Sequence, residues 1–192
     1  TGGGANEFRL TSGTANTTAI AVNLVVSGGS LVATFGTGNT AINVTGSTTI
    51  SGGTMIGRVG TGSYTLTVGG TMTVSGGTYT PTTSGGATAT TSVTGGFTLS
   101  SGTVTSPGSG HVHVYSMAFL TVSAGTFGMS VSSNSNLTIT SAGNVTVSGT
   151  GSMASASTGN ITINCGGDYI QSSSSANAFR FQDGSSASRV YR

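Results

Sequence analysis

Two histidines, His111 and His113, are the side chains whose type and spacing come closest to a chemical site. Residues two apart on a β-strand project from the same face, and two neighbouring imidazoles can chelate a transition metal ion. No third ligand is evident near them, because the single Cys165 lies far along the chain. We therefore predict no metal site and no cofactor, and interpret the pair as exposed polar residues on the outside of a strand.

Carboxylates are too few and too scattered for catalysis. Enzymes that cleave polysaccharides on β-helical folds need carboxylates that bind calcium or act as acid and base, with a Lys or Arg base. The acids of this chain are Glu7, Asp168 and Asp183, and none lies in its middle. We predict that the protein is not an enzyme.

The composition excludes several further classes of protein. Of 192 residues 34 are Gly and only 4% are charged, against roughly 25% in ordinary domains. No basic stripe exists for nucleic acid, and no apolar run approaches the ~18 residues of a membrane span. The lone Cys165 excludes an internal disulfide, and we expect it to point inward as an inert thiol. Because the sequence begins at Thr1 without Met, we expect a processed product or a piece of something longer.

A repeat of about 24 residues organises the chain. Six segments align: LVVSGGSL (24–31), TTISGGTM (48–55), MTVSGGTY (72–79), FTLSSGTV (97–104), LTVSAGTF (120–127) and VTVSGTGS (145–152). Their central apolar residues are spaced by 24, 24, 25, 23 and 25 residues, and each is followed by Ser. Units of this length cannot bury their own apolar side chains, so they must stack on one another.

Two further columns of residues complete each repeat. Segments with period-two alternation precede the first column, which indicates strands with one buried face. Their predicted inward residues are Ile42 and Val44, Leu66 and Val68, Val112 and Val114, Leu137 and Ile139, and Ile161 and Ile163. A third apolar column consists of Leu31, Met55, Tyr79, Val104 and Phe127. Gly between the columns allows the positive φ angles of tight corners.

The sequence therefore predicts an all-β fold, a single-stranded parallel β-helix with three short strands per coil. We expect it to be right-handed, with about seven coils of ~24 residues stacked at the strand spacing of about 4.8 Å. One continuous solenoid is predicted over residues 1–192, with its register set by Val26, Ile50, Val74, Leu99, Val122, Val147 and Ile163.

The two ends of the chain resemble each other. ANEFRL (5–10) recurs as ANAFRF (176–181), displaced by close to seven coils. An uncapped solenoid end is an exposed strand edge that invites pairing, so we expect end-to-end stacking or continuation of the coils. The alternative is that Glu7, Arg9, Arg180 and Asp183 prevent such pairing.

One face of the predicted solenoid carries uncharged hydrogen-bonding side chains. We expect its outward residues to be Thr65, Thr67, Thr90, Ser92, His111, His113, Asn136, Thr138, Asn160 and Thr162. Such a face could bind a carbohydrate or ice, although solubility alone explains it and Thr-x-Thr recurs cleanly only at Thr65 and Thr67.

The recurring apolar-Thr-Val-Ser-Gly-Gly-Thr pattern, with GGDYIQSSS (166–174) leading into AFRFQDGSS (178–186), resembles the repetitive surface proteins secreted by gliding and related Bacteroidota-type bacteria. It is similar, more loosely, to filamentous-haemagglutinin-like adhesins. The resemblance implies an extracellular, cell-surface adhesin or filament component. Its expected partners are further copies or coils of the same solenoid, and a glycan or cell surface.

Overall fold

The structure, a computed structural model, consists of β-strands joined by corners. It describes residues 7–12, 15–20, 22–83, 86, 88–106, 110–129, 135–155, 159–176, 178–181 and 189–191. Every strand pairing within these residues is parallel. The predicted fold class is confirmed: the chain is an all-β parallel solenoid.

One side of the solenoid is an eight-stranded sheet. In order, its strands are β2 (Ala15–Ile20), β5 (Asn39–Val44), β8 (Tyr64–Val68), β10 (Thr88–Val93), β12 (Val112–Met117), β15 (Asn136–Ser141), β18 (Asn160–Cys165) and β21 (Arg189–Tyr191). Ile42 pairs with Leu66 and Leu66 with Thr91, so successive coils are offset by the predicted 24 or 25 residues.

The other side is a thirteen-stranded sheet that contains the remaining two strands of each coil. The short strands are β3 (Leu24–Val26), β6 (Thr48–Ile50), β13 (Leu120–Val122), β16 (Val145–Val147) and β19 (Tyr169–Gln171). The third strands are β1 (Glu7–Ser12), β4 (Ser30–Phe35), β7 (Thr54–Val59), β14 (Thr126–Gly128), β17 (Ser152–Ser155) and β20 (Phe179–Phe181). In β9 (Met72–Thr82) and β11 (Phe97–Val104) the short and third strands run together without a break.

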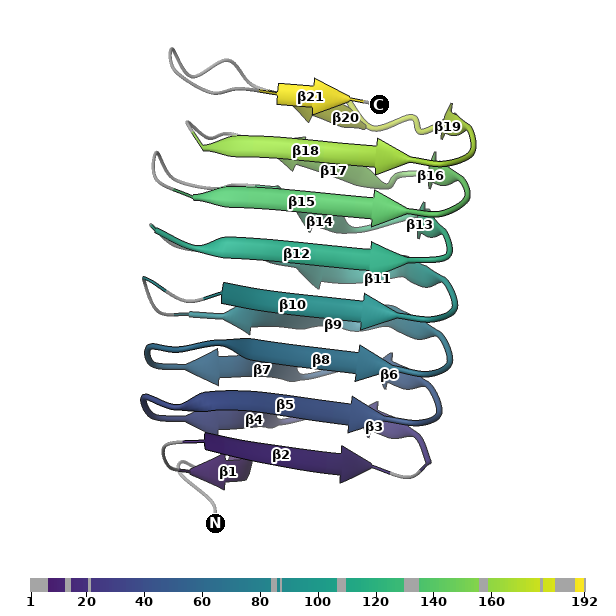
Figure 1. Cartoon of the computed structure of the whole chain (residues 1–192). Helices are drawn as coiled ribbons and strands as arrows, with labels where there is room; N and C mark the ends of the chain where they lie inside the picture. Colours follow the sequence, from purple (N-terminus) through teal and green to yellow (C-terminus); the bar gives the residue numbers. More distant parts are fainter. Residues whose placement is uncertain are drawn as a thin grey trace.

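Figure 1 shows how these strands wind. The eight-stranded sheet runs from left to right at the front, the other strands return behind it, and the chain climbs from the N-terminus to the C-terminus. This path is a right-handed coil, as expected.

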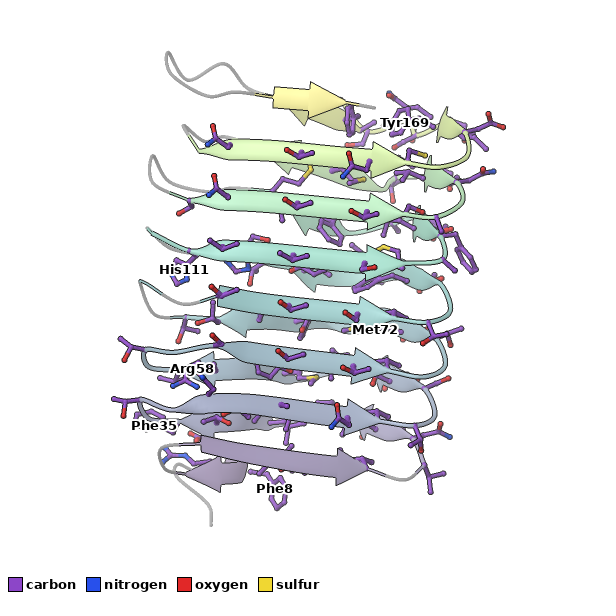
Figure 2. All side chains as sticks on the ribbon, viewed as in Figure 1. Phe8, Phe35, Arg58, Met72, His111 and Tyr169 are labelled. Atoms are coloured by element: carbon purple, nitrogen blue, oxygen red, sulfur yellow. The ribbon has the colours of Figure 1, made fainter. Side chains whose placement is uncertain are left out.

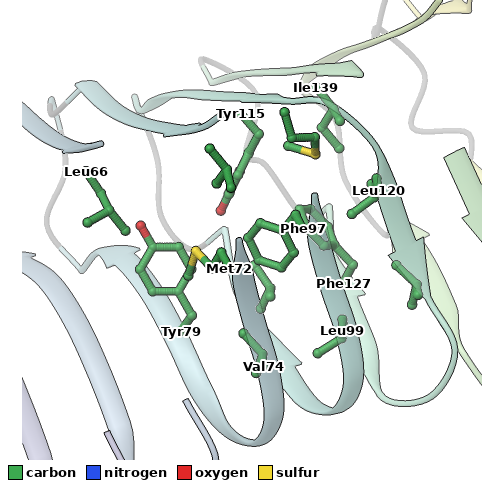
Figure 3. Packing of buried hydrophobic residues seen from close by; sticks show 14 of the residues in the cluster. Leu66, Met72, Val74, Tyr79, Phe97, Leu99, Tyr115, Leu120, Phe127 and Ile139 are labelled. Carbon is green, nitrogen blue, oxygen red and sulfur yellow. The ribbon is translucent and has the colours of Figure 1, made fainter. Parts of the chain in front are cut away.

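The core is a set of columns along the solenoid axis (Figure 3). All six central residues of the repeat are buried, and so is the third column: Val26, Ile50, Val74, Leu99, Val122, Val147, Leu31, Met55, Tyr79, Val104 and Phe127. Aromatic side chains pack together in the middle coils, where the ring of Phe97 lies edge-on to that of Phe127 with 5.8 Å between the ring centres. Thr91 also points inward, and its hydroxyl forms a hydrogen bond of 2.8 Å with the hydroxyl of Tyr79 on the opposite sheet.

Glycines stack at the corner between the short and third strands. Gly53, Gly102 and Gly125 have positive φ angles of 69°, 83° and 79°. A Cβ on Gly102 would lie 2.2 Å from the carbonyl oxygen of Gly77 in the coil below. These positions need glycine both for the left-handed backbone and for the close approach of coils.

Side-chain oxygens link coils at the corner that leads into the short strands. The Ser47 N–H donates to Asn23 Oδ1 at 2.7 Å, and the Thr71 N–H donates to Ser47 Oγ at 3.1 Å. Asn144 Oδ1 accepts from the Asp168 N–H at 2.9 Å in the same way. The polar corner column therefore satisfies backbone donors that have left the strand ladder.

Candidate functional site

The outward side of the eight-stranded sheet, called here the outer face, is arranged in straight columns. Thr65 pairs with Thr90, and Asn136 pairs with Asn160. Eight of the ten predicted residues lie on the outer face at half-buried or exposed positions: Thr65, Thr67, Thr90, Ser92, Asn136, Thr138, Asn160 and Thr162. The Asn160 side-chain amide donates to Asn136 Oδ1 at 3.0 Å, so stacked polar side chains bond to one another along the rod.

The prediction for His111 and His113 is wrong. Both side chains point into the solenoid and are 0% and 1% exposed. Val112 and Val114, predicted to face inward, are half-buried on the outer face instead, where Val114 pairs with Thr90 and Thr138. The outer face is therefore polar on the strands next to β12, whereas β12 contributes Val112 and Val114 to it beside the exposed Ser116.

The residues that follow 111–114 explain why the histidines and not the valines face inward. Strand β12 continues into Tyr115 and Met117, which are in phase with the histidines, and Ser116, which is in phase with the valines. Burying Tyr115 and Met117 removes more apolar area from water than burying Val112 and Val114. Tyr115 also pairs with Thr91 and Ile139 in an inner column, so inversion keeps that column continuous.

The two imidazoles are neighbours within the interior. Their ring centres are 5.5 Å apart and the rings are tilted by 36°. His113 pairs with Ala89 in the coil below and Leu137 in the coil above, and the His111 N–H donates to Ser135 Oγ at 3.1 Å. Burial lowers the pKa of His111 below its usual value, because the charged form is poorly solvated there.

Acidification is expected to destabilise the fold through His111. A lowered pKa in the folded state means that the unfolded chain binds the proton first, so stability is full above pH 6.5 and declines below it. The decline is at most about 1.4 kcal/mol per pH unit for each such group. Strands β10, β11, β14 and β15 carry no ionisable side chain. The reference pKa of a carboxylic acid is near 4, so a loss of stability between pH 6.5 and 5.5 is assigned to histidine.

Urea unfolding at pH 8, 6.5 and 5.5 measures this effect. The free energy of unfolding should be constant between pH 8 and 7 and fall towards pH 5.5, and His111→Asn should flatten the profile. A wild-type profile that stays level to pH 5.5 would refute the buried neutral imidazole.

Arg58 is a buried charge that sequence reasoning did not assign to the interior. The side chain is 0% exposed and donates to backbone carbonyls of Gly36 at 2.7 Å, Gly60 at 3.2 Å and Ser63 at 3.5 Å, and to that of Thr61. Desolvation lowers its pKa, yet arginine remains protonated in proteins. The guanidinium thus joins the corner between β7 and β8 to the coil below. The sequence shows that Arg58 is the only charged residue between Leu10 and Gly167, but it does not show that the side chain points into the solenoid.

Replacing Arg58 with Met should destabilise the protein by about 2–4 kcal/mol, because four backbone carbonyls lose the charged donor that they share. Arg9→Met is the matched control, since Arg9 is partly exposed and bonds to Glu7; an ion pair of this kind contributes about 0–1 kcal/mol. Chemical denaturation of both variants makes the comparison, and equal losses would show that the Arg58 contacts contribute little.

The described acids do not form a catalytic pair. Glu7 bonds to Arg9 on β1, and Asp168 is exposed at a corner near the other end of the chain; Asp183 lies outside the described residues. Among the described residues no three His, Cys, Asp or Glu side chains gather, and no helix could span a membrane.

Cys165 lies at the end of β18, half-buried against the core. Its thiol contacts the carbonyl oxygens of Gly143, Gly167 and Asp168, each at 3.4 Å. The side chain therefore packs towards the interior, as expected, without being fully enclosed.

In the first described coil, apolar side chains line a pocket and face away from the coil above. A pocket of about 310 Å³ lies against β1 and β3, lined by Phe8, Leu10, Leu24, Val25, Val26, Ser27, Gly28, Ser30 and Leu31. Phe8 is 59% exposed although it belongs to the inner third column, where it pairs with Leu31. Figure 2 shows Phe8 at this end and Tyr169 at the opposite one.

Comparisons with protein families, with curated proteins and with solved structures gave no match to this chain.

Proposed function

We propose that this chain is a non-catalytic rod segment of a secreted surface or filament protein, and that its coils associate end to end with those of a second copy. The observation that carries the proposal is that the end coils, as far as they are described, present strand edges beside apolar side chains: Phe8 and Val25 at one end, and Ile170 and Phe179 at the other. A solenoid normally needs a capping unit with a polar outer face to remain soluble as a single particle.

The N-terminal end offers strand edges as well as apolar surface. Within the described residues β1 pairs only with β4, β2 only with β5, and β3 only with β6. The row of outward Thr residues on the short strands begins at this end with Val25, which is exposed and pairs with Thr49. Open edges next to exposed apolar side chains are typical of surfaces that pair with another chain.

The C-terminal end is apolar in two of the same columns. The row that begins with Val25 ends with the exposed Ile170, and the inner column that begins with Phe8 ends with Phe179. The rings of Phe179 and Tyr169 lie 4.7 Å apart between centres. In the described chain β20 and β21 each pair with one strand only.

These ends fit each other in a head-to-tail arrangement. Placing β20 and β21 of one copy beneath β1 and β2 of the next continues both parallel sheets in the same direction, and brings Phe179 beneath Phe8. The repeated ANEFRL and ANAFRF sequences lie at these two positions. Glu7 and Arg9 bond to each other and Arg9 lies 4.5 Å from the Phe35 ring centre, so β1 presents no net charge against pairing. The side chains of Arg180 and Asp183 lie outside the described ones.

The secreted location rests on composition and resemblance. Low charge, abundant Gly, Ser and Thr, and the resemblance to bacterial surface repeat proteins support an extracellular rod. The non-catalytic role is supported by the wide separation of Glu7 and Asp168 along the rod.

Phe8→Asp tests the end-to-end contact. Sedimentation velocity of the wild-type chain should show concentration-dependent association, and Phe8→Asp should weaken it at least tenfold, since a charge would be buried in the contact. Phe119→Asp is the control, because Phe119 is a similarly exposed ring over Gly96 at a lateral corner. A wild-type chain that stays monomeric at high concentration, or equal effects of the two variants, would contradict the proposal.

The outer face supports a second candidate function, the binding of glycan or ice. The observation in its favour is the alignment of hydroxyl columns, in which Thr65 pairs with Thr90 and Thr138 with Thr162. Replacing Thr65 and Thr138 with Tyr should then abolish glycan-array or ice-recrystallisation signals and leave unfolding unchanged. The absence of any such signal in the wild-type chain would discard this function.

A further inference from the structure

We propose that His111 and His113 form a two-imidazole site for one divalent first-row transition metal ion, such as Zn²⁺, Ni²⁺ or Cu²⁺, beneath the corner that leads into β12. The sequence alone predicts that the pair lies on the outside of a strand, without a third ligand and hence without a metal site. The structure turns both rings inward, where they are buried side by side.

The spacing of the rings suits a shared ion. An ion bound about 2.0–2.1 Å from an imidazole nitrogen lies about 3.2 Å from the ring centre, so two rings at a tetrahedral angle have centres about 5 Å apart. The observed separation is 5.5 Å. One nitrogen of each ring can therefore reach the same ion after a small rotation of the side chains.

The environment favours a ligand for at least one of the rings. Both nitrogens of His111 are buried, and neither has a hydrogen-bond partner among the described residues. A buried polar atom without a partner is unfavourable, and a bound ion is one of the ordinary ways in which proteins satisfy it.

The surroundings also define the class of ion. Strands β10, β12 and β15 carry no carboxylate, which disfavours Ca²⁺ and Mg²⁺, because both ions require oxygen ligands. Imidazole nitrogen suits Zn²⁺, Ni²⁺ and Cu²⁺. The protein supplies only two nitrogen ligands, and oxygen atoms would fill the other coordination positions of the ion. We therefore expect weaker binding than in structural zinc sites, which have four protein ligands.

The site is close to the surface. Gly110, which directly precedes His111, is exposed and has a φ of 74°. Figure 2 shows His111 at the side of the solenoid where the chain turns into β12. Ala89 lies beneath His113 in the stack, and its small side chain leaves the ring more room than the Tyr64 of the next coil down would.

Copper titration with electron spin-echo spectroscopy tests this site directly. The two imidazoles are the only ones in the chain, so one equivalent of Cu²⁺ should show two coordinated imidazoles. His111→Asn and His113→Asn should each weaken Zn²⁺ binding at least tenfold by calorimetry. Cys165→Ser should leave the affinity unchanged.

Two outcomes would overturn the proposal. One is a folded wild-type chain whose bound Cu²⁺ shows no imidazole coupling, which needs no variant to interpret. The other is Zn²⁺ binding of equal affinity in the wild type and in the double variant.

Discussion

Replacing Leu99 with Asp is expected to abolish the fold around β11, at a cost of at least about 4 kcal/mol. Leu99 is fully buried and pairs with Val74 below and Val122 above, which are buried as well. A carboxylate there would have no partner, and an uncompensated buried charge costs several kcal/mol. Since whole domains are stable by only about 5–15 kcal/mol, this change is expected to unfold the chain or split the stack.

The matched control for Leu99→Asp is its neighbour. Thr98 lies on the outside of the same strand, between Thr73 and Thr121, and is half-buried. Thr98→Asp should therefore change the free energy of unfolding by no more than about 1 kcal/mol. Circular dichroism during guanidinium denaturation compares the two variants, and similar losses for both would contradict the assignment of the inner column.

Replacing Gly102 with Ala is expected to cost about 3 kcal/mol or more, a large effect for one methyl group. An L-residue in the left-handed region loses about 1–2 kcal/mol from its own backbone. The added Cβ would also meet the Gly77 carbonyl oxygen at 2.2 Å. Because Gly125 stacks on Gly102 in the same manner, the displacement should pass to the next coil.

Gly28→Ala is the matched control for the corner. Gly28 precedes the corner glycine of its coil and is not among the glycines with positive φ, and a Cβ added to it would meet no heavy atom within 4 Å. Its replacement should alter stability by no more than about 1 kcal/mol. Thermal unfolding of both variants decides the matter, and a tolerated Gly102→Ala would show that the corner can adopt another backbone.

The register of the solenoid could be predicted from the sequence because it depends on local chemistry that repeats. Apolar residues such as Val74 and Leu99 recur at a constant offset, and each is followed by Ser and then by a corner that requires Gly. Stacking identical chemistry in register is what makes these positions both recognisable and buried. The period and the columns of the short strands from Val26 to Val147 and of the third strands are therefore predicted correctly. Ile163, predicted as the next member of the short-strand column, lies instead on β18 in the eight-stranded sheet, and Val147 pairs with Gln171.

The direction of β12 could not be predicted from four residues. In residues 111–114, with the sequence HVHV, valine is more apolar than histidine, so alternation alone predicts that the valines face inward. The outcome depends on Tyr115 and Met117, which lie further along the strand and outweigh two valines in buried area. The signal was present, since Tyr115 lies 24 residues after the inward Thr91.

The polar interior depended on three-dimensional neighbours. Arg58 is buried because carbonyls of two coils converge on its guanidinium, and no pattern in the sequence reports that convergence. The pocket against β1 and β3 is likewise lined by residues of several strands, including Phe8, Leu24 and Leu31. Both features belong to the stack and not to any single repeat.

Cryo-electron microscopy of the wild-type chain at high concentration tests the central claim most directly. The account predicts filaments one solenoid wide, with parallel strands about 4.8 Å apart along the filament axis and β20 of each copy next to β1 of the following copy. Single short particles at every concentration, or filaments joined through the outer face, would contradict it.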